Sequence, residues 1–177
     1  MHKKLLLTIA LILAPLALPA AELPGDFVEH ISALTDGHTG SPVKLKKNGV
    51  ITTKATFKPP VEILIEAKTG STNLRVGYAA GQLIFNWEND RTQLRVDGGP
   101  AGGKHKFGAG VIPVDKYVVI RWLVTPKKQS VFVDGQLRFE HSGDYSHLDN
   151  PVSVFSAAGS EITVKSIKVK KLPPGTE

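Results

Sequence analysis

The residues best suited to binding chemistry lie in residues 84–97, where arginine, asparagine and glutamate side chains alternate with apolar ones. The segments 74–78, 83–87 and 94–96 each alternate between apolar and polar residues, so a meander of three strands would place the polar residues on one sheet face. Arginine supplies a planar fork of donors, glutamate two acceptors and asparagine both kinds, and sugar hydroxyls need such fixed partners. We therefore predict a glycan-binding site formed by four residues of this face: Arg75, Asn86, Glu88 and Arg95. The alternative is a solvent-facing surface with cross-strand charge pairs.

Residues for hydrolytic catalysis show no diagnostic spacing. A glycoside hydrolase needs two carboxyl groups on either side of the scissile bond, and the nearest candidates are Glu62 with Glu66 and Glu88 with Asp90. Pairs of this kind are commoner on solvent-exposed strand faces than in active sites. The sequence has no G-x-S-x-G motif for a serine nucleophile and no cysteine for a thiol nucleophile. We therefore expect no catalytic residues, and a glycoside hydrolase or lyase is the alternative function.

Metal ions and phosphates also lack a recognisable site. The six histidines include no pair at i,i+2 or i,i+4 spacing and no H-E-x-x-H motif. Four loop aspartates could ligate calcium, but turn formation explains them better: Asp36, Asp97, Asp144 and Asp149. The glycine-rich run 98–103 lacks the Lys-Ser/Thr pair of a phosphate-binding loop and is typical of a hairpin loop. We expect no cofactor and no metal site, and structural calcium has no support in the sequence.

The elements that would position these residues are short strands. Apolar residues recur at every second position in four successive segments between residues 61 and 97, which is typical of half-buried antiparallel strands. Both tryptophans, Trp87 and Trp122, lie in register with apolar neighbours, so we expect both in the core. Residues 118–124 continue the pattern with one wholly apolar face: Val118, Ile120, Trp122 and Val124.

Turn signals and irregularities complete the prediction of the fold. Asp134-Gly135 between two strand-like runs predicts a two-residue hairpin, since both turn positions need a positive φ angle. The apolar residues of the last strand change parity at Lys165-Ser166, which predicts a β-bulge. Only residues 26–34, whose apolar residues have helical spacing, suggest a short helix. The sequence therefore predicts an all-β fold, a two-sheet antiparallel β-sandwich of the jelly-roll type.

The N-terminus has the three-part pattern of a secretory signal peptide. A basic start is followed by an apolar run over residues 5–18 and by small residues at positions 20 and 21. The run is short for a membrane span and contains Pro15, so we expect cleavage near residue 20 rather than an anchor. The absence of cysteine excludes a lipoprotein anchor. We therefore expect an exported protein, located in the periplasm, at the cell surface or in the medium.

The remaining chain has the length of one domain. We predict residues 21–42 as a segment packed on the sandwich, residues 43–172 as the sandwich itself and residues 173–177 as a flexible tail. The chain has 22 Lys+Arg against 16 Asp+Glu, for a formal net charge of +6. These basic residues are spread through strands and turns, so a solvated surface explains them better than nucleic-acid binding. An anionic sugar would suit the positive charge.

A strand, a V-D-G hairpin and a closing strand follow one another in the second half of the chain. They comprise Trp122, the run Val131-Phe132-Val133-Asp134-Gly135 with Leu137, and the closing run Glu161-Ile162-Thr163-Val164-Lys165-Ser166-Ile167-Lys168-Val169. Over residues 43–172 the sequence thereby resembles the concanavalin A-like lectin/glucanase and laminin-G-type superfamily. Residues 84–88, 94–96 and 143–145 resemble exported domains of this kind in planctomycete-type bacteria. The resemblance implies a jelly-roll sandwich, in a superfamily of lectins, glycanases and adhesion modules.

Two motifs of that superfamily are not seen in this sequence, the E-x-D-x-x-E run of its glucanases and the Asp/Asn calcium loop of legume-type lectins. Catalytic and metal-binding roles therefore do not carry over. We predict an exported, non-catalytic binding domain with a glycan or polysaccharide as partner, without nucleic-acid binding and without a membrane span once the signal is removed. The alternatives are a glycoside hydrolase or lyase of the same fold and a purely structural cell-envelope protein.

Overall fold

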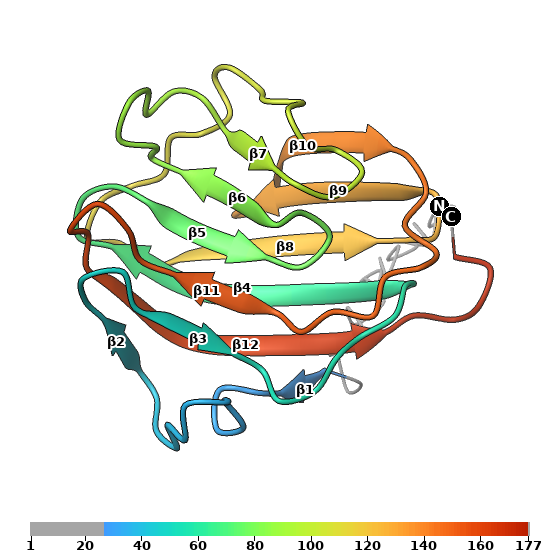
Figure 1. The fold of residues 1–177 in the computed structure, drawn as a ribbon, viewed down its shortest axis with the longest axis horizontal. Coiled ribbons are helices and arrows are strands. Elements are labelled where there is room, and N and C mark those ends of the chain that lie inside the picture. The colour runs from blue at the N-terminus through green and yellow to red at the C-terminus, as the bar shows by residue number, and fades with distance from the viewer. Residues whose placement is uncertain (1–26, 177) are drawn as a thin grey trace, which may run out of the picture.

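The chain folds as two antiparallel sheets packed face to face, without a helix in residues 27–176, which the computed structural model describes (Figure 1). The seven-stranded sheet has the order β1 (Val28–Glu29), β12 (Ile162–Lys171), β4 (Val61–Thr69), β8 (Val118–Val124), β9 (Lys128–Val133) and β10 (Gln136–Ser142), and β2 (Val43–Leu45) also pairs with β12. The five-stranded sheet has the order β3 (Val50–Thr52), β11 (Ser153–Phe155), β5 (Leu74–Gly77), β6 (Gln82–Phe85) and β7 (Arg95–Asp97). The predicted all-β, two-sheet jelly roll is confirmed.

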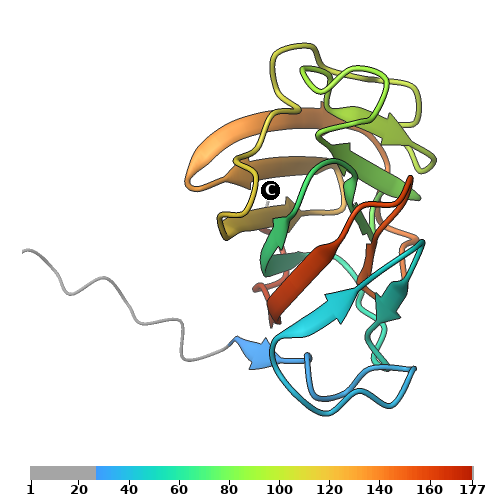
Figure 2. The ribbon, with the colours of Figure 1, turned by 90° about the vertical axis from the view of Figure 1, so that its left-hand side faces the viewer.

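Seen from the side, the two sheets form separate layers with connecting loops at their edges (Figure 2). The long connection of residues 98–117 leads from β7 in one sheet to β8 in the other, and it begins as a hairpin because Lys106 pairs with Leu94. No helix of the described residues is long and apolar enough to cross a membrane. The predicted signal segment, residues 1–20, lies outside the described residues.

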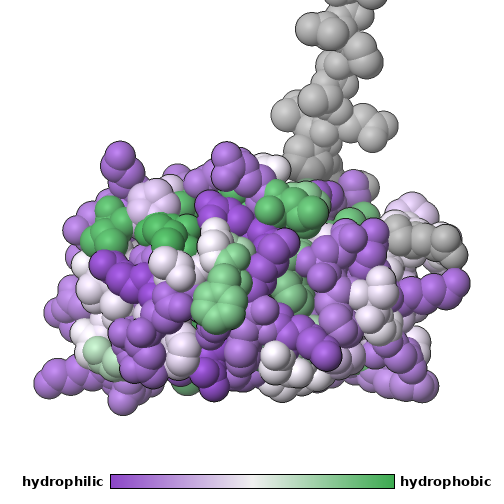
Figure 3. All heavy atoms as spheres, turned by 90° about the horizontal axis from the view of Figure 1, so that it is seen from above, coloured by the Kyte–Doolittle hydropathy of each residue, from purple (hydrophilic) through white to green (hydrophobic). Residues whose placement is uncertain are grey.

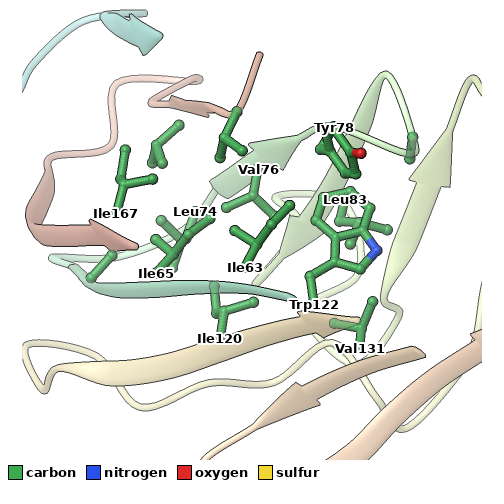
Figure 4. Packing of buried hydrophobic residues seen from close by; sticks show 14 of the residues in the cluster. Ile63, Ile65, Leu74, Val76, Tyr78, Leu83, Ile120, Trp122, Val131 and Ile167 are labelled. Carbon is green, nitrogen blue, oxygen red and sulfur yellow. The ribbon is translucent and has the colours of Figure 1, made fainter. Parts of the chain in front are cut away.

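The core lies between the sheets because burial alternates along the strands. Every other residue of β4 and of β8 is buried, and the residues between them are partly or fully exposed. Trp122 is fully buried, and its ring meets the ring of Tyr78 edge-on at 6.0 Å between centroids (Figure 4). The indole N–H of Trp122 donates to Gln129 Oε1 at 2.8 Å, which satisfies the polar atom of the ring. The predicted apolar face is confirmed as core: Val118, Ile120, Trp122 and Val124.

Both local irregularities that the sequence predicts are present. Asp134 and Gly135 have φ angles of 49° and 78° and join β9 to β10 as a two-residue turn. The register of β12 against β4 shifts at Lys165, which is the extra residue of a bulge. Because of this bulge, Val164 and Ile167 both face the core although three positions separate them.

The short helix suggested over residues 26–34 is wrong for the described part of that segment. The chain there forms β1, which pairs with the edge of β12, and turns follow. Ile31 lies in a turn and Leu34 in an antiparallel bridge to Thr53, and both are buried, so their spacing does not reflect a helical face. A segment this short gains more from the unpaired backbone groups of a strand edge than from its own helical bonds.

Exposed apolar side chains occur on the edge that carries the 98–117 connection. Phe107 is 72% exposed and Val111 49%, and Leu137 of the neighbouring β10 is 51% exposed. Seen from above, the apolar groups of this side are separated by hydrophilic side chains (Figure 3). On the side visible in that view, they therefore do not form one continuous apolar face.

Candidate functional site

The outer face of the five-stranded sheet carries a row of side chains that crosses all five strands. In the three central strands β5, β6 and β7, the residues before and after each member of the row are core residues, so the row points away from the core. Ile84 of this row is only 1% exposed although it lies outside the core cluster, because Arg75 and Arg95 flank it on the neighbouring strands. Antiparallel pairing aligns the row as Val50, Phe155, Arg75, Ile84 and Arg95.

Arg75 is held on this face by three hydrogen-bonding partners. Its Nε and Nη2 donate to Asn73 Oδ1 at 3.1 and 2.7 Å, and its Nη1 donates to Gln82 Oε1 at 3.1 Å. Its Nη2 also donates to Glu88 Oε1 at 3.4 Å. The side chain of Arg75 is 17% exposed and that of Glu88 is 34% exposed, so both stay accessible from solvent. A guanidinium with this many fixed partners is already oriented for a ligand oxygen.

The polar contacts continue across β6 and β7 to an aromatic ring. Gln82 Nε2 donates to Asp97 Oδ2 at 3.2 Å, and Arg95 Nε donates to the two carboxylate oxygens of Asp97 at 3.0 and 2.9 Å. The guanidinium carbon of Arg95 lies 4.4 Å from the centre of the Trp87 ring, within cation–π distance. We call this connected set the arginine face, and it consists of Arg75, Gln82, Trp87, Glu88, Arg95 and Asp97.

Three of the four predicted site residues lie together on the arginine face, and the fourth does not. Arg75, Glu88 and Arg95 belong to it, whereas Asn86 is 1% exposed. The Oδ1 of Asn86 accepts from the Ile112 N–H at 3.0 Å, and its Nδ2 donates to the Ile112 carbonyl at 2.9 Å. The expectation that Asn86 shares the polar face is therefore wrong, because its amide is used to hold a loop.

The backbone conformation of Asn86 explains a second error, the expected core position of Trp87. Strand β6 ends at Phe85, and Asn86 has a φ angle of 49°, in the left-handed region. This turn of the backbone breaks the alternation, so Trp87 lies partly buried against Arg95 on the outer face and outside the core cluster. The alternation of side chains therefore predicted the correct sheet face only up to Phe85, where β6 ends.

Besides Trp87, the prediction missed three residues of this surface: Gln82, Asp97 and Phe155. Asp97 shares strand parity with Arg95, and Gln82 directly precedes the expected strand, so the alternation held a signal for both. Phe155 reaches Arg75 through the pairing of β11 with β5. Pairing between strands so distant in sequence leaves no local signal.

A groove of about 370 Å³ lies beside the arginine face. Its walls include Phe155 and Ser153 of β11, the turn of residues 77–81 and residues of the loop 148–151. Gly77 is needed here, because a Cβ atom at this position would lie 2.9 Å from the Gly81 carbonyl oxygen and 3.2 Å from the Phe155 ring. Since Phe155 pairs with Arg75, the groove and the arginine face form one continuous outer surface.

The same architecture occurs in solved structures of two glucanases and a galectin. A prokaryotic β-1,3-1,4-glucanase (lichenase) from a mouse hindgut metagenome has a TM-score of 0.59 at 8% identity, over 82% of this chain and 93% of that chain. The β-glucanase of Bacillus licheniformis has a TM-score of 0.58 at 10% identity, over 80% and 83%. A galectin of Caenorhabditis elegans has a TM-score of 0.51 at 11% identity, over 82% and 96%. The fold is a concanavalin A-like jelly roll.

At these identities the similarity concerns the fold alone. No protein-family model matches the sequence, and a search of curated proteins finds no match. The solved structures support the predicted concanavalin A-like architecture. The resemblance to exported domains of planctomycete-type bacteria stays a prediction.

On the other face of this concanavalin A-like jelly roll, the outward carboxylates of β4 are ion-paired. Glu62 accepts a hydrogen bond from Arg121 of β8. Glu66 Oε1 accepts from Lys165 Nζ of β12 at 2.7 Å. The two glutamates that were the first candidate catalytic pair are thus each bound to a cation from a different neighbouring strand.

Where hydrogen bonding shifts the pKa of a carboxyl group in the described residues, it lowers that pKa. A hydrogen bond from Ser130 lowers the pKa of Glu140, and hydrogen bonds from Thr92 lower the pKa of Asp90. Hydrogen bonding lowers the pKa of two further loop residues in the same way, Asp144 and Asp149. A catalytic acid of a glycosidase needs the opposite shift, because it must hold its proton near neutral pH.

Possible metal ligands are dispersed over the surface. His38 Nδ1 lies 3.1 Å from Asp36 Oδ2, and His147 Nε2 lies 3.7 Å from Asp144 Oδ2. Within residues 27–176, no group of three or more His, Cys, Asp or Glu side chains is arranged to hold a metal ion.

Proposed function

We propose that this chain is a non-catalytic glycan-binding domain whose ligand lies on the arginine face. The observation that carries the proposal is the continuous chain of fixed polar groups between two partly exposed aromatic side chains, Phe155 and Trp87. A sugar ring presents hydroxyl groups at its edge and apolar C–H groups on its faces. It is therefore bound by planar donors and acceptors together with flat aromatic surfaces. The groove beside Phe155 supplies room for a sugar residue next to Arg75.

The contacts of the carboxylates favour binding over hydrolysis. Glu88 and Asp97, the two carboxylates of the arginine face, accept hydrogen bonds from Arg75 and Arg95. A carboxylate used in this way can orient a guanidinium and accept from a sugar hydroxyl, but it is not free to protonate a leaving group. The ion pairs of Glu62 and Glu66 on the opposite sheet support the same conclusion.

The class of ligand is supported by the proteins that share the fold. Three of the solved structures with this fold are those of a lichenase, a β-glucanase and a galectin. We extend the ligand class, a glycan, to this chain and not the hydrolytic activity. A glycan with acidic groups would suit the two partly exposed arginines and the net charge of +6, and its affinity should fall as salt screens these charges.

A polysaccharide panel tests the proposal and separates binding from catalysis. We expect the protein to be retained on at least one polysaccharide, without an increase in reducing ends or unsaturated ends during prolonged incubation. Release of either kind of end would replace the binding domain with a hydrolase or lyase. Retention on none of a panel that includes neutral and acidic polysaccharides would contradict glycan binding.

We also propose that the domain acts outside the cytoplasm, because residues 1–20 have the pattern of a cleavable signal. The first residue of protein purified from periplasmic and culture-medium fractions should be residue 21 or a near neighbour. Recovery of the chain from the cytoplasm with Met1 in place would contradict this proposal.

A further inference from the structure

A second polar groove lies on the outer face of the seven-stranded sheet, opposite the arginine face. Pairing of β2, β12 and β4 aligns Lys44, Thr163 and Lys68 in one row, and their strand neighbours are buried. This row forms part of a groove of about 230 Å³, whose wall includes the 40% exposed Tyr117. We call these four residues the lysine groove.

The two lysines of the lysine groove are not ion-paired within residues 27–176, although two carboxylates also line the groove. Among the described residues, neither Lys44 nor Lys68 forms an ion pair with a carboxylate, whereas the nearby Lys165 and Lys46 pair with glutamates at 2.7 and 3.6 Å. Because adjacent strands lie about 4.8 Å apart, the Cα atoms of Lys44 and Lys68 are separated by roughly 10 Å across Thr163. Two unpaired ammonium groups at this separation, with a hydroxyl between them, can contact one charged sugar residue from both sides.

An aromatic side chain completes the groove. The Nζ atoms of Lys68 and Lys165 lie 5.4 and 5.7 Å from the centre of the Tyr117 ring, and these contacts fix its position. The exposed part of the ring offers a flat apolar surface next to the ammonium groups. Asp115 and Glu161 also line the groove and can accept hydrogen bonds from hydroxyl groups.

We propose that the lysine groove is a second binding site of this domain and takes an acidic sugar residue, one that carries a carboxylate or a sulfate. Lys44 and Lys68 contact the acidic group, the Thr163 hydroxyl bonds the sugar and Tyr117 packs on the ring. The inference rests on the proposed glycan-binding function, and it adds both the acidic character of the ligand and a site on the opposite sheet.

Titration of the isotope-labelled full chain, followed by amide NMR shifts, separates the two sites. The probes are a galacturonic acid hexamer, a sulfated galactose hexamer and the neutral cellohexaose. With at least one acidic probe we expect shifts at Lys44, Thr163 and Lys68 that cellohexaose does not cause. Shifts confined to the arginine face would overturn the second site and leave the proposed function intact. Shifts confined to the lysine groove would support the second site and remove the arginine face from the proposal.

Substitutions test whether the two lysines act specifically. The double substitution Lys44→Gln and Lys68→Gln should weaken binding by about tenfold or more for the acidic hexamer that shifts the amides of the lysine groove. Lys168→Gln combined with Lys171→Gln, which removes two charges elsewhere on β12, should change it by less than about twofold. Tyr117→Ala should also weaken binding, while Tyr117→Phe should retain it. An equal loss in the two lysine pairs, or no loss in the first, would overturn the inference.

Discussion

At the scale of single residues, Arg75 links the strands to the proposed ligand. Its guanidinium bonds Asn73, Gln82 and Glu88, yet the side chain stays partly exposed. These contacts fix the plane of the guanidinium without using all of its donors. A side chain already ordered in this way loses little further conformational entropy when a sugar binds, which favours a rigid strand surface as a binding site.

The first prediction concerns the two arginines of that surface. Arg75→Ala and Arg95→Ala should each weaken binding of the retained polysaccharide by about 1–3 kcal/mol, because each removes charge-assisted hydrogen bonds. Isothermal titration with an oligosaccharide of that polysaccharide measures the change, and circular dichroism checks the fold. Arg91→Ala is the matched control, since Arg91 is exposed and bonds the Ser71 carbonyl outside the arginine face. Unchanged affinity in both arginine variants would remove the arginine face as the site.

The second prediction concerns the largest buried side chain. Trp122→Ala should lower the free energy of unfolding by about 3–5 kcal/mol, because it leaves a cavity against Tyr78 and removes the donor that Gln129 accepts from. Urea denaturation followed by circular dichroism measures the loss. A loss below about 1 kcal/mol would contradict the burial of Trp122 between the two sheets.

At the scale of elements, Asn86 joins the end of β6 to the long connection between the sheets. Its side chain bonds both backbone polar groups of Ile112, and its own N–H donates to the Gly110 carbonyl at 2.9 Å. The third prediction is that Asn86→Ala lowers the free energy of unfolding by about 1–3 kcal/mol for each buried backbone group of Ile112 left unpaired. Hydrogen exchange at the Ile112 amide should accelerate as well.

Ligand affinity distinguishes this structural role from the role first predicted for Asn86. Affinity of the folded Asn86→Ala protein for the retained polysaccharide should stay within about twofold, since the amide is buried away from the arginine face. Asn89→Ala, at an exposed position nearby, should change neither stability nor binding. Lost affinity with unchanged stability in Asn86→Ala would return this residue to the binding site.

The sequence predicted these elements well where a local physical rule governs them. Alternation identified β4 to β8, and the Asp134-Gly135 turn and the bulge at Lys165 followed from φ preferences and parity. The candidate site was predicted only in part, because β6 ends at Phe85. That boundary depends on a loop contact from Ile112, which alternation cannot reveal.

At the scale of the whole molecule, the two proposed sites lie on opposite outer faces of one sandwich. The two sheets that separate these sites are packed about 10 Å apart, and core side chains fill the space between the sheets. A single short glycan therefore cannot contact the arginine face and the lysine groove at once without passing round an edge. If both sites bind, the domain would connect two polysaccharide chains or two segments of one chain.

The last prediction concerns the stability of the whole sandwich as pH falls. Burial lowers the pKa of His30, which packs edge-on against Phe57 at 5.0 Å, below its ordinary value of 6.5. Between that lowered pKa and 6.5 the unfolded chain binds a proton that the folded chain does not, so stability should decline as pH falls through this range. The pKa values of Asp90, Glu140 and Asp144 are also lowered in the folded chain. They stabilise the fold at any pH above the ordinary carboxyl pKa of about 4, and this contribution is lost as the pH falls further.

Urea denaturation at about pH 7, 5 and 3 should therefore show a decline in the free energy of unfolding in two steps. His30→Gln removes the imidazole and should reduce the first step while leaving the acid step in place, because the carboxyl groups are unchanged. Ser130→Ala, which removes the hydrogen bond to Glu140, should leave the first step and weaken the second. Stability that rises between pH 7 and 5, or an equally large first step in His30→Gln, would show that His30 does not cause the decline. The contribution of the carboxyl groups is tested separately by the fall in the free energy of unfolding below about pH 4. An equal fall in the Ser130→Ala variant and in the unaltered chain would contradict the contribution of Glu140.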